Sequence, residues 1–491
     1  MAEQQGITPR ATDYSQWYLD VIERGSLVDD SPVRGCKVLR PHGYAIWEGI
    51  QRELDGRFKD TGHVNAYFPL FIPVSFLSKE AEHVEGFAKE CAVVTHHRLR
   101  AKAGGGVEAD PESVLEEPLV VRPTSETIIW HMYGRWIDSW RDLPLLINQW
   151  ANVVRWEMKT RPFLRTAEFL WQEGHTAHAS SDEAVAETQK MLGVYTSFCE
   201  EFLAVPVVPG RKSARERFAG AVDTFTIEAM MQNGWALQAG TSHFLGQNFA
   251  KAFDVTFQSE AGTRDFVWAT SWGVSTRLIG ALVMTHSDDE GLVLPPRAAP
   301  VQVVIVPVYK NEERATVLAA VDRLHAELKG KFRVKVDDRD NLRPGAKYFE
   351  WEQKGVPLRL EVGPRDVAKG QAFAKRRTGG DKFAVPFEGA AGVVAQVLEQ
   401  MQADLLERAR KLRDERTYTV ASWDEFTEKI ESQPGFYRIP WGGDDADEDR
   451  VKEQTRATLR CHPLDAASVD GLTCPLTGKP AREWAIFARA Y

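Results

Sequence analysis

The residues best suited to chemistry lie in two neighbouring segments, 152–157 and 161–175. If both segments are strands, alternate side chains share one face, because strand side chains repeat with a period of two. The first strand then directs Arg155 and Glu157 to the same side. The second adds two aromatic rings, a carboxylate and an imidazole, from Phe169, Trp171, Glu173 and His175. Such a surface is suited to binding a nucleotide and an amino acid, although a solvated sheet face laced with salt bridges has the same composition.

The segments around these residues indicate the elements that position them. Residues 1–293 mix helical and strand patterns, with a helix expected over 44–58 and an apolar run of strand length at 66–73. Pro69 lies in that run, and proline removes a ladder donor, so this strand is expected at a sheet edge or an interface. Three prolines within 294–300 end the preceding helix and indicate a linker.

Beyond the linker, strand and helix patterns alternate, which predicts a compact α/β domain with a partly parallel sheet. The expected strands are 301–307, 333–337 and 358–362, and the expected helices are 312–328 and 393–412. A third unit begins near Thr417 and ends in a strand pattern at 484–491. We therefore expect three domains, at 1–293, 300–410 and 417–491.

Composition limits the class of protein. A chain of 491 residues is too long for one core, and 43% hydrophobic with 27% charged residues is ordinary for a soluble globular protein. We expect no signal peptide and no membrane segment, because no apolar run approaches the ~20 residues that a membrane helix needs. Five scattered cysteines suit a reducing cytoplasm. Residues 331–382 hold fourteen Lys or Arg against eight Asp or Glu, which indicates either a phosphate-facing surface or a solvated face.

Five motifs resemble the class II aminoacyl-tRNA synthetases, and two of the five narrow the resemblance to the prolyl-tRNA synthetase family. The resemblance covers nearly the whole chain and extends to the archaeal and eukaryote-like type of this family. The motifs are Gly62 to Pro69 (motif 1), Pro123-Thr-Ser-Glu126, Arg155-Trp-Glu157 (motif 2), Gln238-Ala-Gly-Thr241-Ser-His243, and Gly273-Val-Ser-Thr-Arg277-Leu-Ile-Gly280 (motif 3).

The resemblance implies an α+β fold: a catalytic core with an antiparallel sheet, an α/β anticodon-binding domain and a small α/β C-terminal domain. It also implies a homodimer that uses ATP with Mg²⁺, L-proline and tRNA(Pro). Two alternatives remain open at this point: a synthetase for another small amino acid, such as threonine or glycine, and a non-catalytic synthetase-like protein that binds tRNA.

Amino-acid activation requires attack by the substrate's own carboxylate on the α-phosphorus of ATP, so catalysis depends on positioning and on neutralising phosphate charge. Arginine suits this task because its planar fork pairs with phosphate and stays charged. The resemblance implies catalytic roles for Arg155, at the α-phosphate and the proline carboxylate, and for Arg277, at the γ-phosphate and the adenine. The other ATP contacts that it implies are Glu157, Arg165, Thr166, Phe169, Gln238 and Thr241, with Phe169 stacked on adenine and Gln238 orienting Mg²⁺.

For proline, the resemblance implies that Glu126 and the hydroxyl of Thr124 bind the secondary ammonium. The ring pocket would be formed by Trp171, Glu173, His175, His243 and Ser275. One methylene is worth only ~1–3 kcal/mol, so alanine should also enter this pocket. Some family members carry a large editing insertion between motifs 2 and 3, but only roughly sixty residues separate Glu173 from Gln238 here, too few for that domain.

Three of these residues also have plainer interpretations. Thr124 fits a turn position that caps the following helix. Arg277 fits an ordinary arginine on a helix surface. His175 and His178 could suggest a metal pair, but a spacing of three on a strand puts them on opposite faces, so we expect no metal there.

The segments after the linker carry further predictions. In the α/β domain the candidates for reading anticodon bases are Arg339, Arg343, Lys347, Phe349, Glu350 and Trp351. The third unit departs from the family's four-cysteine zinc pattern. Pro440-Trp441 is followed by Gly442 and the acidic run 444–449 with no cysteine, and Thr477 stands where the partner of Cys474 would be. Structural zinc needs four ligands, so we expect none here. Tyr491 either docks its carboxylate toward the active site, as the family suggests, or frays.

Overall fold

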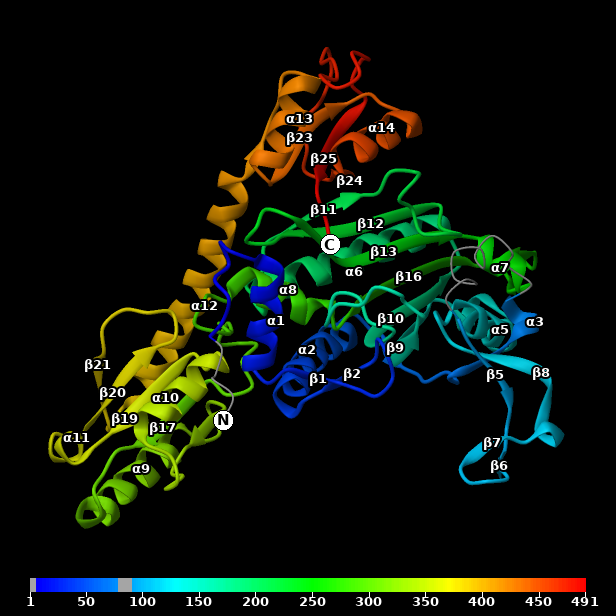
Figure 1. Ribbon diagram of the computed structural model, residues 1–491. Coiled ribbons are helices and arrows are strands. Elements are labelled where there is room, and N and C mark those ends of the chain that lie inside the picture. Colours follow the sequence, from blue (N-terminus) through cyan, green and yellow to red (C-terminus); the bar gives the residue numbers. More distant parts are fainter. Residues whose placement is uncertain (1–5, 78–90) are drawn as a thin grey trace.

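The computed structural model describes residues 6–77 and 91–491, and its largest element is an eleven-stranded sheet (Figure 1). Its central strands are antiparallel, which confirms the antiparallel core predicted for the first domain. In spatial order the strands are β22 (Thr417–Tyr418), β23 (Phe436–Trp441), β25 (Glu483–Ala488), β24 (Thr458–Pro463), β11 (Val207–Arg211), β12 (Asp223–Met230), β13 (Ala236–Gly246), β16 (Trp268–Ser275), β10 (Glu168–His178), β9 (Leu145–Val154) and β3 (Val64–Asn65).

Helices pack on both faces of this sheet: α2 (Pro41–Asp60) and α6 (Ser181–Glu201) cover one face, and α5 (Glu126–Trp136) and α7 (Asn248–Ala252) cover part of the other. The longest of these, α6, lies along the central strands, and α2 confirms the helix predicted over 44–58. Phe58 of α2 packs against Trp272 of the sheet, with the ring centroids 5.0 Å apart. A Cβ added at Gly174 would lie 2.1 Å from the Trp272 ring, so this close packing requires glycine on β10. The other helices of the first domain are α1 (Tyr14–Arg24), α3 (Val74–Leu77) and α8 (Arg277–His286).

The apolar run 66–73 is not one continuous strand, so the expectation of a single strand there was wrong. Only its last three residues are extended, in β4 (Phe71–Pro73), while β3 ends at Asn65. Pro69 has no N–H to donate and lies between these two short strands. β4, the part of the run that is a strand, lies at the edge of a three-stranded sheet, as expected, and β3 forms the last strand of the large sheet. The smaller sheets contain β4 with β8 (Val114–Val121) and β5 (Ala92–His96), β6 (Leu99–Ala101) with β7 (Val107–Ala109), β1 (Val28–Asp30) with β2 (Lys37–Leu39), and β14 (Thr256–Gln258) with β15 (Arg264–Phe266).

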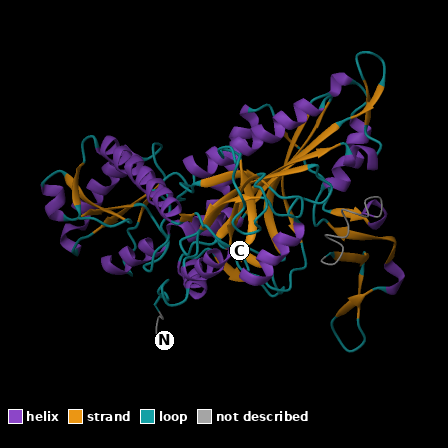
Figure 2. Ribbon diagram, turned by 90° about the horizontal axis from the view of Figure 1, so that it is seen from above, coloured by secondary structure: helices purple, strands orange, loops and turns teal. Residues whose placement is uncertain are grey.

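The domain after the linker is an α/β unit at one end of the molecule (Figure 2). Its first strand in sequence, β17 (Val303–Pro307), runs parallel to both neighbours, and β20 and β21 run antiparallel, which confirms a partly parallel sheet. The strands are β18 (Val334–Val336), β17, β19 (Leu358–Val362), β20 (Gln371–Arg376) and β21 (Phe383–Pro386), in that order. The helices are α9 (Arg314–Leu328), α10 (Pro344–Gln353), α11 (Pro364–Ala368) and α12 (Ala390–Glu415).

The C-terminal unit is joined to the first domain through the large sheet. Helix α12 runs from the α/β domain to this unit (Figure 1), which contains α13 (Trp423–Ser432) and α14 (Asp445–Thr455). Its strand β24 then pairs with β11 of the first domain, with Gly210 opposite Pro463. A Cβ on Gly210 would lie 2.6 Å from the Cys461 side chain, so the two units approach as closely as glycine allows. The first and third of the units predicted from the sequence therefore share one continuous sheet.

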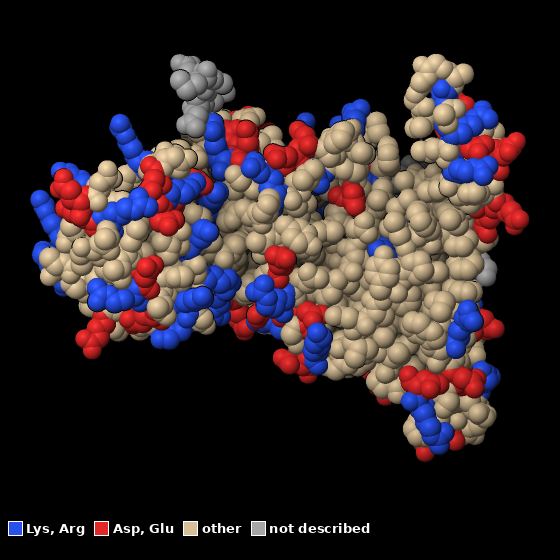
Figure 3. Space-filling model, turned by 90° about the horizontal axis from the view of Figure 1, so that it is seen from below, with Lys and Arg blue, Asp and Glu red and all other residues tan. Residues whose placement is uncertain are grey.

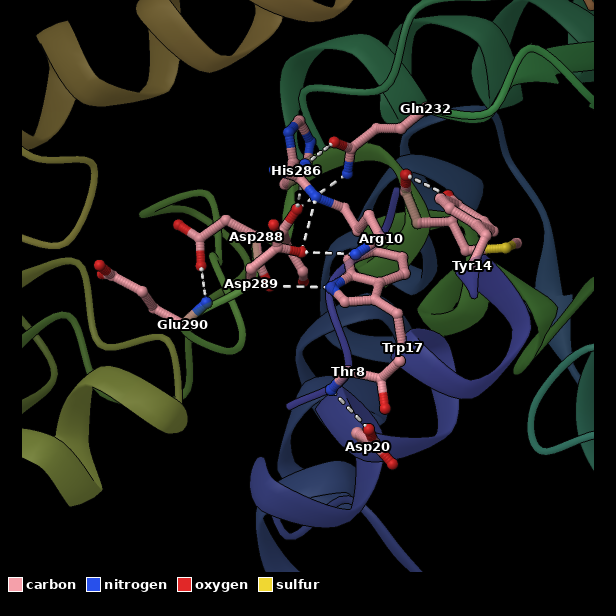
Figure 4. Close-up of polar contacts among 12 residues, drawn as sticks. Thr8, Arg10, Tyr14, Trp17, Asp20, Gln232, His286, Asp288, Asp289 and Glu290 are labelled. Carbon is pink, nitrogen blue, oxygen red and sulfur yellow. Dashed lines mark hydrogen bonds and ion pairs between the residues drawn. The ribbon is translucent and has the colours of Figure 1, made fainter. Parts of the chain in front are cut away.

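The N-terminal segment and the end of α8 meet beside the α/β domain (Figure 4). The indole N–H of Trp17 donates to the carbonyl of Asp288 at 2.9 Å, and Arg10 pairs with Asp289 at 3.1 Å. The Asp288 carboxylate in turn accepts two hydrogen bonds, of 2.6 and 2.8 Å, from the buried guanidinium of Arg377 in the α/β domain. A two-pronged ion pair of this kind fixes direction as well as distance, so it sets how the two domains face each other.

Candidate active site

A pocket of about 280 Å³ opens on the face of the large sheet opposite α6, beside the start of α5. Twelve of the residues singled out from the sequence line it, although they come from segments more than 150 residues apart. They are Thr124, Glu126, Arg155, Phe169, Trp171, Glu173, His175, Gln238, Thr241, His243, Ser275 and Arg277.

Strand register explains why these residues converge. On β10, β16 and β13 the partners align in rows across the sheet, so residues distant in sequence share one face. One row runs from His175 through Ser271 to His243, and the next pairs Glu173 with Gly273. The predicted alternation of Phe169, Trp171, Glu173 and His175 on one face of β10 is confirmed.

The first strand of the pair ends earlier than the sequence analysis supposed. β9 stops at Val154, so the expectation that Arg155 and Glu157 project from one strand face was wrong. Arg155 still continues the pairing with one backbone bond, from its N–H to the carbonyl of Ala167 at 2.8 Å, and it lines the pocket. Glu157 turns away because the chain leaves the sheet to form the tight turn between Arg161 and Arg165.

Glu157, Arg165 and Thr166 lie on this turn, outside the residues that line the pocket. Glu157 forms an ion pair with Arg165 at 2.7 Å, and the Arg165 side chain is largely exposed. The hydroxyl of Thr166 donates to the carbonyl of Glu168 at 2.7 Å. Their contacts in this structure therefore hold the turn together.

Two guanidinium groups, of Arg155 and Arg277, line the same pocket and lie close enough to repel each other. Arg155 donates from Nε to the carbonyl of Pro123 at 3.0 Å, and its Cζ lies 5.5 Å from the ring centroid of Phe169. Arg277 begins α8 and donates from Nε to the carbonyl of Leu164 at 3.3 Å, so it is not the helix-surface arginine of the alternative interpretation. Burial lowers the pKa of Arg277, and the charge of Arg155 lowers it further. Two cations that repel each other in a buried site are suited to a polyanionic ligand, which removes the repulsion.

A buried carboxylate faces the same space. Glu126 is 4% exposed, and the hydroxyl of Thr124 donates to it. Helix α5 begins at Glu126 with Ser125 as its N-cap, so the capping interpretation of Thr124 was wrong. Ser125 instead donates its hydroxyl to Glu173 at 2.5 Å.

The pKa values of the two pocket histidines shift in opposite directions. Burial lowers the pKa of His243 to about 4, with the charge of Glu126 opposing this shift, so its ring is neutral at pH 7. Burial also lowers the pKa of His175, but the hydrogen bond and the charge of Glu173, 3.0 Å away, outweigh it and leave the pKa above its ordinary value. His178 lies on the opposite face of β10 and bonds to Thr176, as the spacing of three predicts.

Several lining residues were missed by the sequence analysis. Ser271 follows from the period of two on β16, and Thr224, which bonds Nδ1 of His243 at 3.0 Å, follows from the alternation of β12. Phe218 stacks on His243 with ring centroids 4.6 Å apart, but it lies in a loop whose sequence carries no periodic signal. Lys212 lies just after β11 and is almost fully buried.

Comparisons with known proteins show to which family this chain, with its set of pocket side chains, belongs. Residues 110–286 match the tRNA synthetase class II core domain (G, H, P, S and T), residues 302–397 match an anticodon binding domain, and residues 423–491 match the prolyl-tRNA synthetase C-terminal domain. A proline–tRNA ligase of Porphyromonas gingivalis is 59% identical, over 100% of this chain and 99% of its own length. The chain belongs to the prolyl-tRNA synthetase family.

Other relatives span the chain equally well. A proline–tRNA ligase of Cytophaga hutchinsonii is 55% identical, over 98% of this chain and 99% of its own length. The crystal structure of prolyl-tRNA synthetase from Cryptosporidium parvum, complexed with halofuginone and AMPPNP, superposes with a TM-score of 0.91 at 40% identity and covers 99% of both chains. The chain is therefore a class II synthetase in fold, with the α+β core, the anticodon-binding domain and the C-terminal domain expected from its motifs.

Most anticodon-reading candidates already have partners within the domain. Arg339 forms ion pairs with Asp337 and Glu350, and the indole of Trp351 donates to Asp337 at 2.8 Å. The Lys347 ammonium donates to the carbonyl of Asp337 and is buried. Phe349, in contrast, is 54% exposed, as a platform for stacking bases must be.

The C-terminal tyrosine is docked on the first domain and does not fray. Its N–H donates to the carbonyl of Ala236 at 3.1 Å, and its hydroxyl accepts from Asn233 at 2.8 Å. The guanidinium of Arg161, on the motif 2 turn, lies 5.6 Å from the centroid of the Tyr491 ring. The end of the chain thus contacts the turn that carries Glu157 and Arg165.

Within residues 6–77 and 91–491, no three His, Cys, Asp or Glu side chains gather as a metal-binding group. In the C-terminal unit Cys461 and Cys474 are buried thiols. The absence of structural zinc stays a prediction. No helix in the same described ranges has the length and apolar character needed to cross a membrane.

Proposed function

We propose that this chain activates L-proline with ATP, forms prolyl-adenylate and pyrophosphate, and transfers the prolyl group to the 3′ end of tRNA(Pro). The observation that carries the proposal is the convergence of Arg155, Arg277 and the buried carboxylate of Glu126 on one pocket. The guanidinium groups suit a triphosphate, and the carboxylate suits an ammonium group. We also propose a cytoplasmic location, where tRNA is charged for translation. We further propose that activation and tRNA binding are divided among three domains, at 1–293, 300–410 and 417–491.

In this proposal Arg155 holds the α-phosphate and the proline carboxylate in line for attack. Its contacts with Pro123 and with the rings of Phe169 and Trp171 fix its orientation before substrate binds, which is the condition for electrostatic catalysis. Arg277, at the start of α8, binds the γ-phosphate and covers one face of adenine. Phe169 stacks on the other face.

The remaining ATP contacts come from the turn and from β13. Glu157 accepts from the adenine amino group, and Arg165 and Thr166 contact the nucleotide once the turn closes over it. Gln238 and Thr241, whose side chains line the pocket, bind the phosphates.

Mg²⁺ fits this site as a companion of ATP. Mg²⁺ keeps several waters and is bound by one or two protein oxygens plus substrate phosphates. Gln238 lines the pocket with an amide that offers one such oxygen, whereas the carboxylate of Glu228, beside it in the sheet, is already bonded to Lys212 and Arg460. The ion supplies neutralisation of phosphate charge, and Gln238 would orient it.

For proline, Glu126 is the counter-charge of the secondary ammonium, and Thr124 supplies a hydroxyl beside it. A neutral His243 adds no competing positive charge, because burial lowers the pKa of this imidazole to about 4. The wall of the ring pocket consists of Trp171, Glu173, His175, His243 and Ser275. Glu173 holds this wall rigid by accepting hydrogen bonds from Ser125 and Gln149 at 2.5 and 2.8 Å.

We also propose that the chain works as a homodimer joined along the motif 1 edge. Edge strands left open are templates for pairing, and apolar side chains cluster around this edge, with Val64 58% and Tyr67 70% exposed. Seen from below, charged side chains are dense over the α/β end of the molecule and sparse over the wide central face (Figure 3). Sedimentation should give twice the chain mass, and Tyr67→Asp should shift the mass toward the monomer. A wild-type monomer at micromolar concentration would refute the dimer.

Proline-dependent exchange of pyrophosphate into ATP is the direct test of the function. The purified chain should support exchange with proline far better than with threonine, glycine or cysteine, and should then charge tRNA(Pro). Exchange that prefers threonine or glycine would identify a different synthetase. Binding of tRNA without any exchange would identify the non-catalytic alternative.

A further inference from the structure

A buried cluster of three charges lies directly behind the pocket. Its centre is Glu228 on β12, which has no exposed surface. Lys212 donates to its Oε1 at 2.9 Å, and Arg460 donates to its Oε2 at 3.0 and 3.1 Å. A third donor, the hydroxyl of Thr226, completes the set at 3.1 Å.

The two cations come from different parts of the fold. Lys212 follows β11 of the first domain, is 2% exposed, and lines the pocket. Arg460 lies on β24 of the C-terminal unit and reaches Glu228 because β24 pairs with β11 over Gly210 and Arg211. The C-terminal unit therefore places a charge at the catalytic pocket across the sheet.

The cluster carries a net positive charge. Burial alone would raise the pKa of Glu228, but Arg460 and Lys212 outweigh it and keep the carboxylate ionised. Two cations around one anion leave one positive charge in excess. Arg460 is also close enough to Arg277 to lower the pKa of that guanidinium.

Removing one cation redistributes the others. With Arg460 absent, one oxygen of Glu228 lacks its donor, and a buried carboxylate with a missing partner is costly. The ammonium of Lys212 is a flexible point charge on a four-carbon stem, so it can move to cover both oxygens. That movement withdraws it from the pocket wall.

We propose that Arg460 is a positioning residue for adenylate formation: by holding one oxygen of Glu228, it keeps the ammonium of Lys212 at the pocket wall, where Lys212 contacts the phosphates of ATP. This inference rests on the proposed function of the pocket. The competing explanation is that the ion pairs only fasten the C-terminal unit to the sheet.

The test compares kinetics with folding. Arg460→Met and Lys212→Met should each lower kcat/KM for ATP in pyrophosphate exchange by about tenfold or more, the scale for losing one preorganised phosphate contact. The KM for proline should stay within about twofold, because the ammonium of Lys212 is bonded to Glu228, whereas the proposed proline site is centred on Glu126. Arg211→Met is the matched control, since it breaks an ion pair of 2.7 Å with Glu483 between the same two units but outside the pocket. It should leave exchange unchanged.

A double variant separates positioning from fastening. If Arg460 acts on ATP only through Lys212, adding Arg460→Met to Lys212→Met should lower kcat/KM for ATP no further. If the ion pairs only fasten the units, the two losses should add and should follow the fall in the urea midpoint.

Two results would overturn the proposal: wild-type ATP kinetics in Lys212→Met, or losses from Lys212→Met and Arg460→Met that add in the folded double variant. Where the Met variants do not fold, Arg460→Lys keeps the charge and should still raise the KM for ATP, because lysine cannot reproduce the two-pronged bond. Wild-type kinetics in that variant would likewise contradict positioning. A wild-type chain without proline-dependent exchange would instead show that the proposed function had failed.

Discussion

Arg155 offers the sharpest test of how the pocket works. Its guanidinium lies 5.5 and 5.7 Å from the ring centroids of Phe169 and Trp171, and its Nε is fixed by the carbonyl of Pro123. The N–H donors of the Arg155 guanidinium are thus oriented before substrate binds. Replacing Arg155 with alanine removes them from the transition state without touching the anticodon-binding domain.

The expected size of the effect follows from these contacts. Loss of one preorganised donor set costs about 2.7–4 kcal/mol in the transition state, or about 10²–10³ in rate. The ring contacts are worth about 0.5–1 kcal/mol each, so the free energy of unfolding should fall by about 1–2 kcal/mol at most. Relief of the repulsion with Arg277 offsets part of that fall. The rate should therefore collapse while the fold remains.

The assay is proline-dependent pyrophosphate exchange, with tRNA binding and urea unfolding measured on the same samples. Arg155→Ala should lose exchange and keep its affinity for tRNA(Pro), and Arg155→Lys should recover part of the rate because the charge returns without the fork. Arg264→Ala is the control, since this arginine is exposed and forms a surface ion pair with Asp138 at 2.7 Å. A folded Arg155→Ala variant with exchange within about tenfold of wild type would refute the reasoning.

Three further predictions follow from the same structure. The chain should form alanyl-tRNA(Pro) at a measurable rate, because alanine lacks only two ring methylenes and each costs just ~1–3 kcal/mol, and it should not hydrolyse this product; deacylation by the pure protein would contradict this. Metal analysis should find no stoichiometric zinc, and a chelator should leave the unfolding midpoint unchanged; a fall in that midpoint would overturn the loss of the site. Finally, the pKa of His175 is raised in the folded protein, so the protonated ring stabilises the fold. This stabilisation is fully present below the ordinary pKa of 6.5 and is lost as pH rises through the raised pKa. The free energy of unfolding of wild type should thus fall relative to His175→Gln above pH ~6.5, and parallel curves would show that Glu173 does not hold the protonated ring.

Local rules in the sequence determined much of the site. Strand alternation alone placed Phe169, Trp171, Glu173 and His175 on one face, because the period of two belongs to the backbone. The same rule separated His175 from His178. The α/β domain also followed from its alternating patterns. The roles of Arg155 and Arg277 came from family motifs, since no periodicity links two residues in distant segments.

Tertiary structure decided what depends on pairing between distant strands. The turn after Val154 took Glu157 out of the sheet, and no local pattern marks where a ladder ends. Lys212, Phe218 and Arg460 reach the pocket region through loops and through the pairing of β24 with β11, a contact between residues about 250 positions apart. Sequence patterns determine which face a side chain takes, whereas the register between strands determines which faces meet, and that register is set only when the whole sheet forms.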